Sequence, residues 1–154
     1  MNLIDAELVR LHMAAQTPAE VLGKLADTLF GKGKVKESYK DAVLQREIQY
    51  PTGLPGAGTC VAVPHTDSSH VLEPALAVGI LQQPVAFQMM GSLDTVLPVE
   101  IVMMLAVDKP EKHLAVLTQL MTMLQDETLL TKIKQATVAT EVCSLLSGLP
   151  AGHM

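Results

Sequence analysis

Ile101-Val102-Met103-Met104-Leu105-Ala106-Val107 is the longest apolar run in the chain. The run has the length of a strand and is far too short to span a bilayer. A strand that is apolar at every position is typical of the centre of a sheet whose two faces are both covered. The next residues predict a helix, with Asp108 as N-cap, Pro110 in the first turn and Glu111 at the capping-box position. This succession of strand and helix indicates an α/β fold.

The rest of the chain supplies further strands and helices around this pair. The predicted elements are a strand at residues 8–13, a helix that begins at the N-cap Thr17 with Pro18 and Glu20, a helix at 38–49, a loop at 51–58 with two prolines and three glycines, strands at 59–63, 75–81 and 85–87, a helix after Asp126, and a last helix that ends at Gly148. We therefore expect an α/β fold with a mixed β-sheet flanked by helices. It should form a single compact layer domain over residues 1–154.

The composition excludes several classes of protein. Hydrophobic residues make up 49% of the 154 residues and charged residues 18%, which indicates a folded chain rather than a disordered one. The net charge of -5 and the aromatic content of 3% argue against a nucleic-acid partner. The N-terminus lacks the pattern of a secretion signal, and Cys60 and Cys143 do not form a disulfide framework. We expect a cytoplasmic protein without direct membrane insertion.

His65 is the residue that most strongly suggests chemistry. It follows a predicted strand and Pro64, and small polar residues come next. A strand end is a rigid base for a reactive group, and the loop after it keeps that group accessible. A neutral imidazole is a nucleophile, and its ordinary pKa leaves much of it neutral at cytoplasmic pH. Position alone leaves open whether His65 is such a nucleophile or a surface histidine.

Two further side chains could assist an anionic substrate. His113 lies near the start of the helix after the central strand, where free N–H groups suit a phosphate. Strand ends and helix starts share one edge of an α/β sheet, so His113 could come close to His65. Arg46 lies near the end of the second helix, and its guanidinium could bind phosphate oxygens in a bidentate way. An exposed helix histidine and a solvated arginine are the structural alternatives.

The loop after His65 also contains side chains that could bind a metal. Residues His65, Asp67, His70 and Glu73 could supply ligands, but their spacing matches no zinc signature. The chain also contains no P-loop, no strand–GxGxxG–helix unit and no GxSxG nucleophile elbow. We expect no metal and no cofactor.

Taken in order, these segments resemble the fructose/mannitol-type (type 2) enzyme IIA of the bacterial phosphoenolpyruvate sugar phosphotransferase system. The matching motifs extend over most of the chain. They are Ala42-Val43-Leu44-Gln45-Arg46-Glu47, Pro51-Thr52-Gly53-Leu54, Val61-Ala62-Val63-Pro64-His65-Thr66, Glu73-Pro74-Ala75-Leu76-Ala77-Val78-Gly79 and His113-Leu114-x-x-Leu117. Within the family, the chain is most similar to galactitol-specific enzyme IIA.

The resemblance implies a phosphoryl carrier. By the family's motifs, His65 accepts the phosphoryl group from the phosphocarrier protein HPr, and Arg46 and His113 contact or stabilise it. The group then passes to a cognate enzyme IIB and serves uptake through the membrane enzyme IIC. The alternatives are a regulatory domain of the nitrogen-related type, a binding module that has lost phosphorylation, and a metal-dependent enzyme.

Overall fold

Residues 101–106 of the apolar run form the second half of the central strand of the sheet. The computed structural model describes residues 3–92 and 94–147, and in it this strand is β5 (Val96–Ala106). It is the third of five strands in the order β1-β4-β5-β3-β2. Ile101 and Met103 belong to one apolar cluster and Val102 and Met104 to the other. The strand is therefore buried on both faces, as its sequence predicts.

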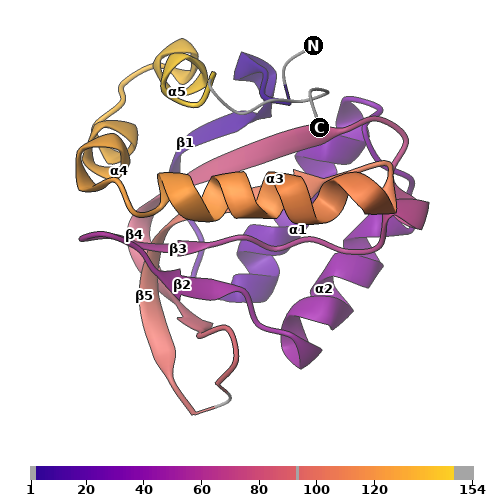
Figure 1. The fold of residues 1–154 in the computed structure, drawn as a ribbon, viewed down its shortest axis with the longest axis horizontal. Coiled ribbons are helices and arrows are strands. Elements are labelled where there is room, and N and C mark those ends of the chain that lie inside the picture. The colour runs from indigo at the N-terminus through magenta and orange to yellow at the C-terminus, as the bar shows by residue number, and fades with distance from the viewer. Residues whose placement is uncertain (1–2, 93, 148–154) are drawn as a thin grey trace.

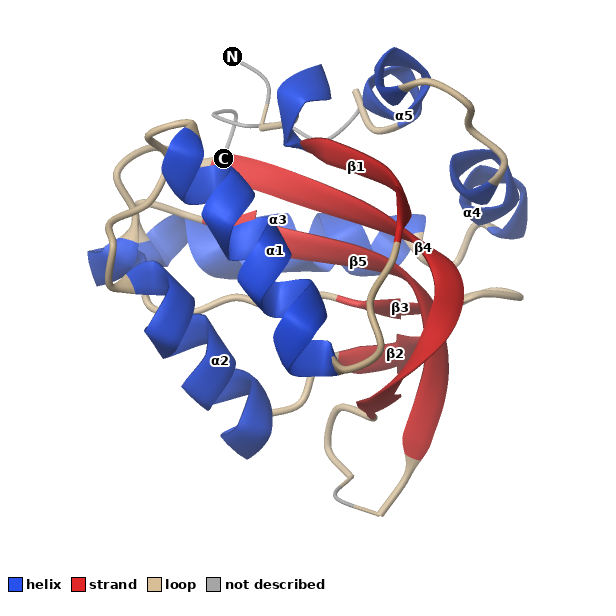
Figure 2. Cartoon of the chain, turned by 180° about the vertical axis from the view of Figure 1, so that it is seen from behind, coloured by secondary structure: helices blue, strands red, loops and turns tan. Residues whose placement is uncertain are grey.

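Helices cover both faces of a mixed sheet, which confirms the predicted α/β class. Strands β1 and β4, like β3 and β5, are parallel, whereas β4 and β5, like β2 and β3, are antiparallel. Helices α1 and α2 lie on one face and α3 on the other; α5 packs against β1, and α4 lies beside α5 on the α3 face (Figures 1 and 2). The remaining bounds are β1 (Val9–Met13), α1 (Pro18–Gly31), α2 (Tyr39–Gln49), β2 (Gly53–Pro55), β3 (Cys60–Ala62), β4 (Ala75–Gln88), α3 (Pro110–Met123), α4 (Glu127–Lys134) and α5 (Ala139–Leu145), with short 3-10 turns at Ala6–Leu8 and Ser68–His70. Within the described ranges, no helix is both long and apolar enough to cross a membrane.

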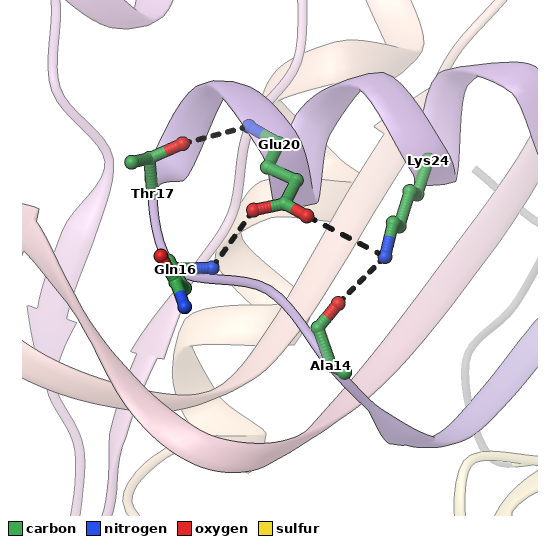
Figure 3. Close-up of polar contacts among 5 residues, drawn as sticks. All are labelled: Ala14, Gln16, Thr17, Glu20 and Lys24. Atoms are coloured by element: carbon green, nitrogen blue, oxygen red, sulfur yellow. Dashed lines mark hydrogen bonds and ion pairs between the residues drawn. The ribbon is translucent and has the colours of Figure 1, made fainter.

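The start of α1 shows how closely local sequence sets the fold. The Thr17 hydroxyl accepts a hydrogen bond from the backbone N–H of Glu20 at 3.2 Å, which confirms the predicted cap (Figure 3). The Glu20 carboxylate in turn accepts from the backbone N–H of Gln16, one residue earlier than in the usual capping box, and it pairs with Lys24. Asp126 caps α4 in the same way by accepting from Leu129 N–H.

The prediction of a loop at residues 51–58 is wrong for residues 53–55 and holds for the residues on either side. Gly53–Pro55 form the edge strand β2, which pairs antiparallel with β3. A Cβ on Gly53 would lie 2.6 Å from the carbonyl oxygen of Gln88, so only glycine lets the chain approach β4 here. The glycines and prolines thus mark an edge strand in close contact with its neighbours.

Two other local predictions also need correction. The strands expected at residues 75–81 and 85–87 are one strand, β4, whose register against β5 shifts between Ile80 and Val85. Asp108 is not the N-cap of α3, because Lys109 occupies that position and makes no side-chain cap bond. Gly148, predicted to end the last helix, lies outside the described residues.

Candidate functional site

His65 lies just after β3 on backbone that is tied to the central strand. The backbone N–H of Leu105 donates to the carbonyl of Pro64 at 3.0 Å, and His65 forms a parallel bridge with Leu105. The buried Tyr39 hydroxyl of α2 donates to the Leu105 carbonyl at 2.8 Å. Strand β5 and helix α2 therefore hold the loop rigidly under His65.

The ring of His65 is held in one orientation. Its Nδ1 lies 2.8 Å from the carbonyl oxygen of Val63, and because a carbonyl can only accept, Nδ1 must carry the proton. The lone pair of Nε2 is then available as a nucleophile. Burial lowers the pKa of His65; the Val63 bond opposes this, and the charges of His113 and Arg46 lower the pKa further. His65 is 9% exposed and neutral at neutral pH, which is the state that can attack phosphorus.

The three residues that the sequence analysis singled out line one hollow. The ring centroids of His65 and His113 are 5.0 Å apart, with the rings edge to face. Arg46 reaches the same place from the last turn of α2, and its guanidinium also lies 5.1 Å from the centre of the Tyr50 ring. The hollow has a volume of about 350 Å³, and its lining comprises Arg46, His65, Thr66, Asp67, Pro110, His113, Leu114 and Leu117.

Two polar atoms of this hollow lack partners. Among the described residues, the buried Nε of Arg46 and the buried Nε2 of His113 make no hydrogen bond. Buried polar groups are nearly always satisfied, so unpartnered ones in a hollow indicate a ligand that supplies the missing atoms. A guanidinium N–H always donates, and an anion with several oxygens is the ligand that such donors fit.

Asp67, for which the sequence suggests only a role as a metal ligand, also lines the hollow. Burial lowers the pKa of His113, and the charge of Arg46 lowers it further, whereas the nearby charge of Asp67 raises it. Asp67 is thus the acidic counterpart to Arg46 within the site. Its place two residues after His65, in the same loop, was the available signal.

Of the side chains named as candidate metal ligands, His65 and Asp67 line the hollow and His70 does not. Nδ1 of His70 lies 2.8 Å from the Ser38 hydroxyl rather than in the hollow. In the part of the chain that the structure describes, no three His, Cys, Asp or Glu side chains are placed to share a metal ion.

Comparison with known proteins identifies the family of this chain. The family model described as "Phosphoenolpyruvate-dependent sugar phosphotransferase system, EIIA 2" matches residues 2–148. The chain belongs to this family. The resemblance carried by the motifs is thereby confirmed: the chain is a member of the type 2 enzyme IIA family of the phosphotransferase system.

Curated enzymes IIA and IIABC are similar to this chain at moderate identity. The 2-O-alpha-mannosyl-D-glycerate-specific EIIABC component of Escherichia coli K12 is 33% identical over 150 residues, covering 94% of this chain. The fructose-specific EIIABC component of Bacillus subtilis is 29% identical over 139 residues and 88% of this chain. The chain spans only 22% and 21% of the lengths of those two relatives. The galactitol-specific EIIA component of Escherichia coli K12 is 30% identical over 80% of this chain and 84% of its own length.

Solved structures share the fold. In the complex of enzyme IIAMTL and phosphorylated enzyme IIBMTL from Escherichia coli, the similar chain is 28% identical, with a TM-score of 0.78 over 95% of this chain and 99% of that one. The nitrogen regulatory protein IIA-Ntr from Neisseria meningitidis has a TM-score of 0.74 over 93% of this chain and 95% of its own. Its 20% identity shows a common fold alone.

Proposed function

We propose that His65 is the phosphorylated residue of this enzyme IIA and that residues 1–154 form a single enzyme IIA domain. The observation that carries the proposal is the hollow in which His65 presents Nε2 beside the unpartnered buried nitrogens of Arg46 and His113. HPr is the donor, and a cognate enzyme IIB, acting with the membrane enzyme IIC, is the acceptor. The protein works in the cytoplasm.

The chemistry follows from the geometry. Nε2 of His65 attacks phosphorus, the N–P bond forms, and the bond between phosphorus and the donor breaks as the donor group leaves with its electron pair. Phosphoryl transfer needs in-line placement and neutralisation of oxygen charge more than covalent assistance. Arg46 supplies a fixed positive charge, and His113 donates from Nε2 when that nitrogen carries its proton. In the onward transfer, a nucleophile of enzyme IIB attacks the same phosphorus, the N–P bond breaks, and Nε2 of His65 regains its lone pair, with the same contacts from Arg46 and His113.

The surface around the hollow suits a protein partner. A second hollow of about 300 Å³ adjoins it, shares Arg46 and His65, and includes Tyr50, Leu114 and Met121. These three apolar side chains are 55%, 76% and 37% exposed. A docked protein would cover them and exclude water from the transfer, which strengthens every charge contact inside. Enzyme IIAMTL is seen with phosphorylated enzyme IIBMTL, and we infer an equivalent enzyme IIB for this chain.

The test is intact-mass spectrometry after incubation with enzyme I, HPr and phosphoenolpyruvate. The wild type should gain one acid-labile phosphoryl group, and His65→Ala should gain none. His70→Ala is the matched control, because His70 lies in the same loop region but bonds Ser38 instead of lining the hollow. Stoichiometric labelling of a folded His65→Ala variant would move the site to another residue. A wild-type protein that gains no phosphoryl group would contradict the proposed carrier function.

The substrate is a sugar or polyol, with galactitol the first to test because the chain matches 84% of the length of the galactitol-specific component. The regulatory alternative shares the fold and differs in the fate of the phosphoryl group. If the chain serves the galactitol system, adding purified galactitol-specific enzyme IIB should transfer the phosphoryl group from this chain to enzyme IIB within seconds. Label that stays on this chain with every sugar-specific enzyme IIB supplied would favour a phosphorylation-dependent regulator.

A further inference from the structure

We propose that Glu47 is a positioning residue for phosphoryl transfer: through Thr52 and Val63 it holds the His65 ring in its reactive tautomer. The proposal rests on the proposed function of His65. Glu47 does not line the hollow around His65, so it acts through other residues and does not touch the phosphoryl group.

The argument begins with an unbroken series of hydrogen bonds. One carboxylate oxygen of Glu47 accepts from the backbone N–H of Thr52 at 2.9 Å, and the other accepts from the Thr52 hydroxyl at 2.8 Å. The Thr52 carbonyl accepts from the Val63 N–H at 3.3 Å. The Val63 carbonyl accepts from Nδ1–H of His65 at 2.8 Å. Three links thus join Glu47 to the nitrogen that sets the tautomer of His65.

These contacts lie among buried residues and fix both partners. Thr52 is 2% exposed and Val63 0%, so water does not compete for their hydrogen bonds. Because both carboxylate oxygens bind the same residue, Thr52 is held in orientation as well as in place. Thr52 and His65 also line one hollow of about 300 Å³, so a displacement of Thr52 would change the surroundings of the His65 ring.

The contact between Glu47 and Thr52 also positions Arg46. Arg46 and Glu47 are neighbours in the last turn of α2, and the backbone N–H of Tyr50 donates to the Arg46 carbonyl at the end of that turn. By tying this turn to Thr52, Glu47 fixes the helix end that carries the guanidinium relative to the loop that carries His65. These two bonds, called here the Glu47–Thr52 clamp, therefore set the distance between the His65 ring and the Arg46 guanidinium.

Glu47 is half-buried, and its carboxyl group is partly removed from water. Burial raises the pKa of Glu47 to about 7, against the lowering effects of the Thr52 bonds and Arg46. The groups that face it are the charged Arg46 on its own helix and the donors of Thr52 from the following segment. A glutamine of the same shape could make both Thr52 contacts, since its amide oxygen accepts from N–H and its NH2 group donates to the hydroxyl.

The test compares Glu47→Ala, Glu47→Gln and Thr52→Val by nitrogen-15 NMR of the His65 ring and by rate of phosphorylation from phospho-HPr. Glu47→Ala should turn the single Nδ1–H tautomer into a mixture and lower the rate at saturating donor by about tenfold, with a smaller change in KM. Glu47→Gln should restore the single tautomer and most of the rate. Thr52→Val loses only the hydroxyl contact with Glu47. Its tautomer ratio and its rate should therefore lie between those of the wild type and those of Glu47→Ala. Glu141→Ala is the matched control, because Glu141 also accepts from a threonine backbone N–H but on α5, away from the site.

A folded Glu47→Ala variant with the wild-type tautomer and rate overturns the proposal, as does a Glu47→Gln variant that fails to restore the tautomer. If Glu47→Ala does not fold, Thr52→Val is judged by the same two measurements. The tautomer is read without any phosphoryl transfer. If the wild type gains no phosphoryl group, the proposed function is wrong. The NMR comparison of the variants still shows whether Glu47 and Thr52 hold the tautomer of His65.

Discussion

A groove of about 520 Å³ lies between α1, α2 and β4, whereas the hollow around His65 has a volume of about 350 Å³. The groove is lined mainly by apolar side chains, namely Pro18, Ala19, Leu22, Leu44, Ile48, Ala86 and Phe87, together with Glu47 and Gln88. The hollow is smaller, and it contains two titratable rings, a guanidinium and a carboxylate. Size alone would direct attention to the groove.

The difference teaches that unpartnered polar atoms identify a site better than volume does. Apolar walls gain from being filled but impose no orientation on the molecule that fills them. Arg46 and His113 each keep a buried polar atom without a partner in the described part of the chain, and such an atom is costly unless a ligand satisfies it. Variants of the two regions should therefore behave differently. Those of the groove, apart from Glu47 with its bonds to Thr52 beside the site, should change stability, and those of the hollow should change transfer.

The largest expected effect lies in the groove. Leu22 is 1% exposed and packs in the core beneath the groove, so Leu22→Ala removes buried methyl groups and enlarges a space that is already there. We expect a loss of about 3 kcal/mol in the free energy of unfolding, measured by urea denaturation. The rate of phosphorylation per folded molecule should stay at the wild-type value. A selective loss of transfer in this variant would give the groove a part in the reaction.

Arg46→Ala should reverse that pattern. Removing the charge that faces the phosphoryl oxygens should slow transfer from phospho-HPr by about 100-fold, as loss of one preorganised charge contact commonly does. Stability should change by less than about 1 kcal/mol, because the side chain makes no ion pair that anchors the fold in the described structure. Arg10→Ala is the control, since Arg10 bonds the Thr28 hydroxyl at an exposed position on another element. If Arg46→Ala takes up the phosphoryl group at the wild-type rate, the proposed contact between Arg46 and the phosphoryl oxygens is excluded.

His113→Ala should have a smaller effect. The ring assists the phosphoryl group without forming a bond to phosphorus, so the rate should fall by about tenfold while full labelling is still reached. Rapid-quench labelling measures the rate, and intact mass measures the end point. If a folded variant takes no label at all, the roles proposed for the two histidines must be exchanged.

How far the sequence predicts the molecule depends on how local the determinant is. The central strand and the Thr17 cap are predictable because their signals lie within a few consecutive residues. The strand β2 is not, because its identity depends on pairing with β3 and on the approach of Gly53 to Gln88. The register shift in β4 between Ile80 and Val85 is likewise a property of two paired strands.

The site shows the same division. His65, His113 and Arg46 can be named from the sequence because their motifs and positions at strand and helix ends are read directly from the chain. Their edge-to-face geometry and the tautomer of His65 depend on contacts between distant segments. Neither the effect of Asp67 on His113 nor the contacts of Thr52 are visible in the sequence, since both arise from side chains that meet only in the fold.

The smallest expected effect lies where the two regions meet, at Glu47, which lines the groove and bonds Thr52 beside the site. Its pKa rises from 4.5 to about 7 through burial, so the folded protein binds this proton more tightly than the unfolded chain does. The resulting stabilisation is fully present below the ordinary pKa and is lost as the pH rises to about 7.

Glu47→Gln has no such proton, so the stability difference between wild type and variant isolates this one group. The wild type should lose about 1 kcal/mol relative to Glu47→Gln between pH 4.5 and 7, a value reduced from the full shift because the side chain is partly exposed. Urea denaturation of both proteins across this range measures the difference, and the titration of His65 cancels because both proteins contain it. A difference that is constant with pH would mean that the Glu47 carboxylate is well solvated.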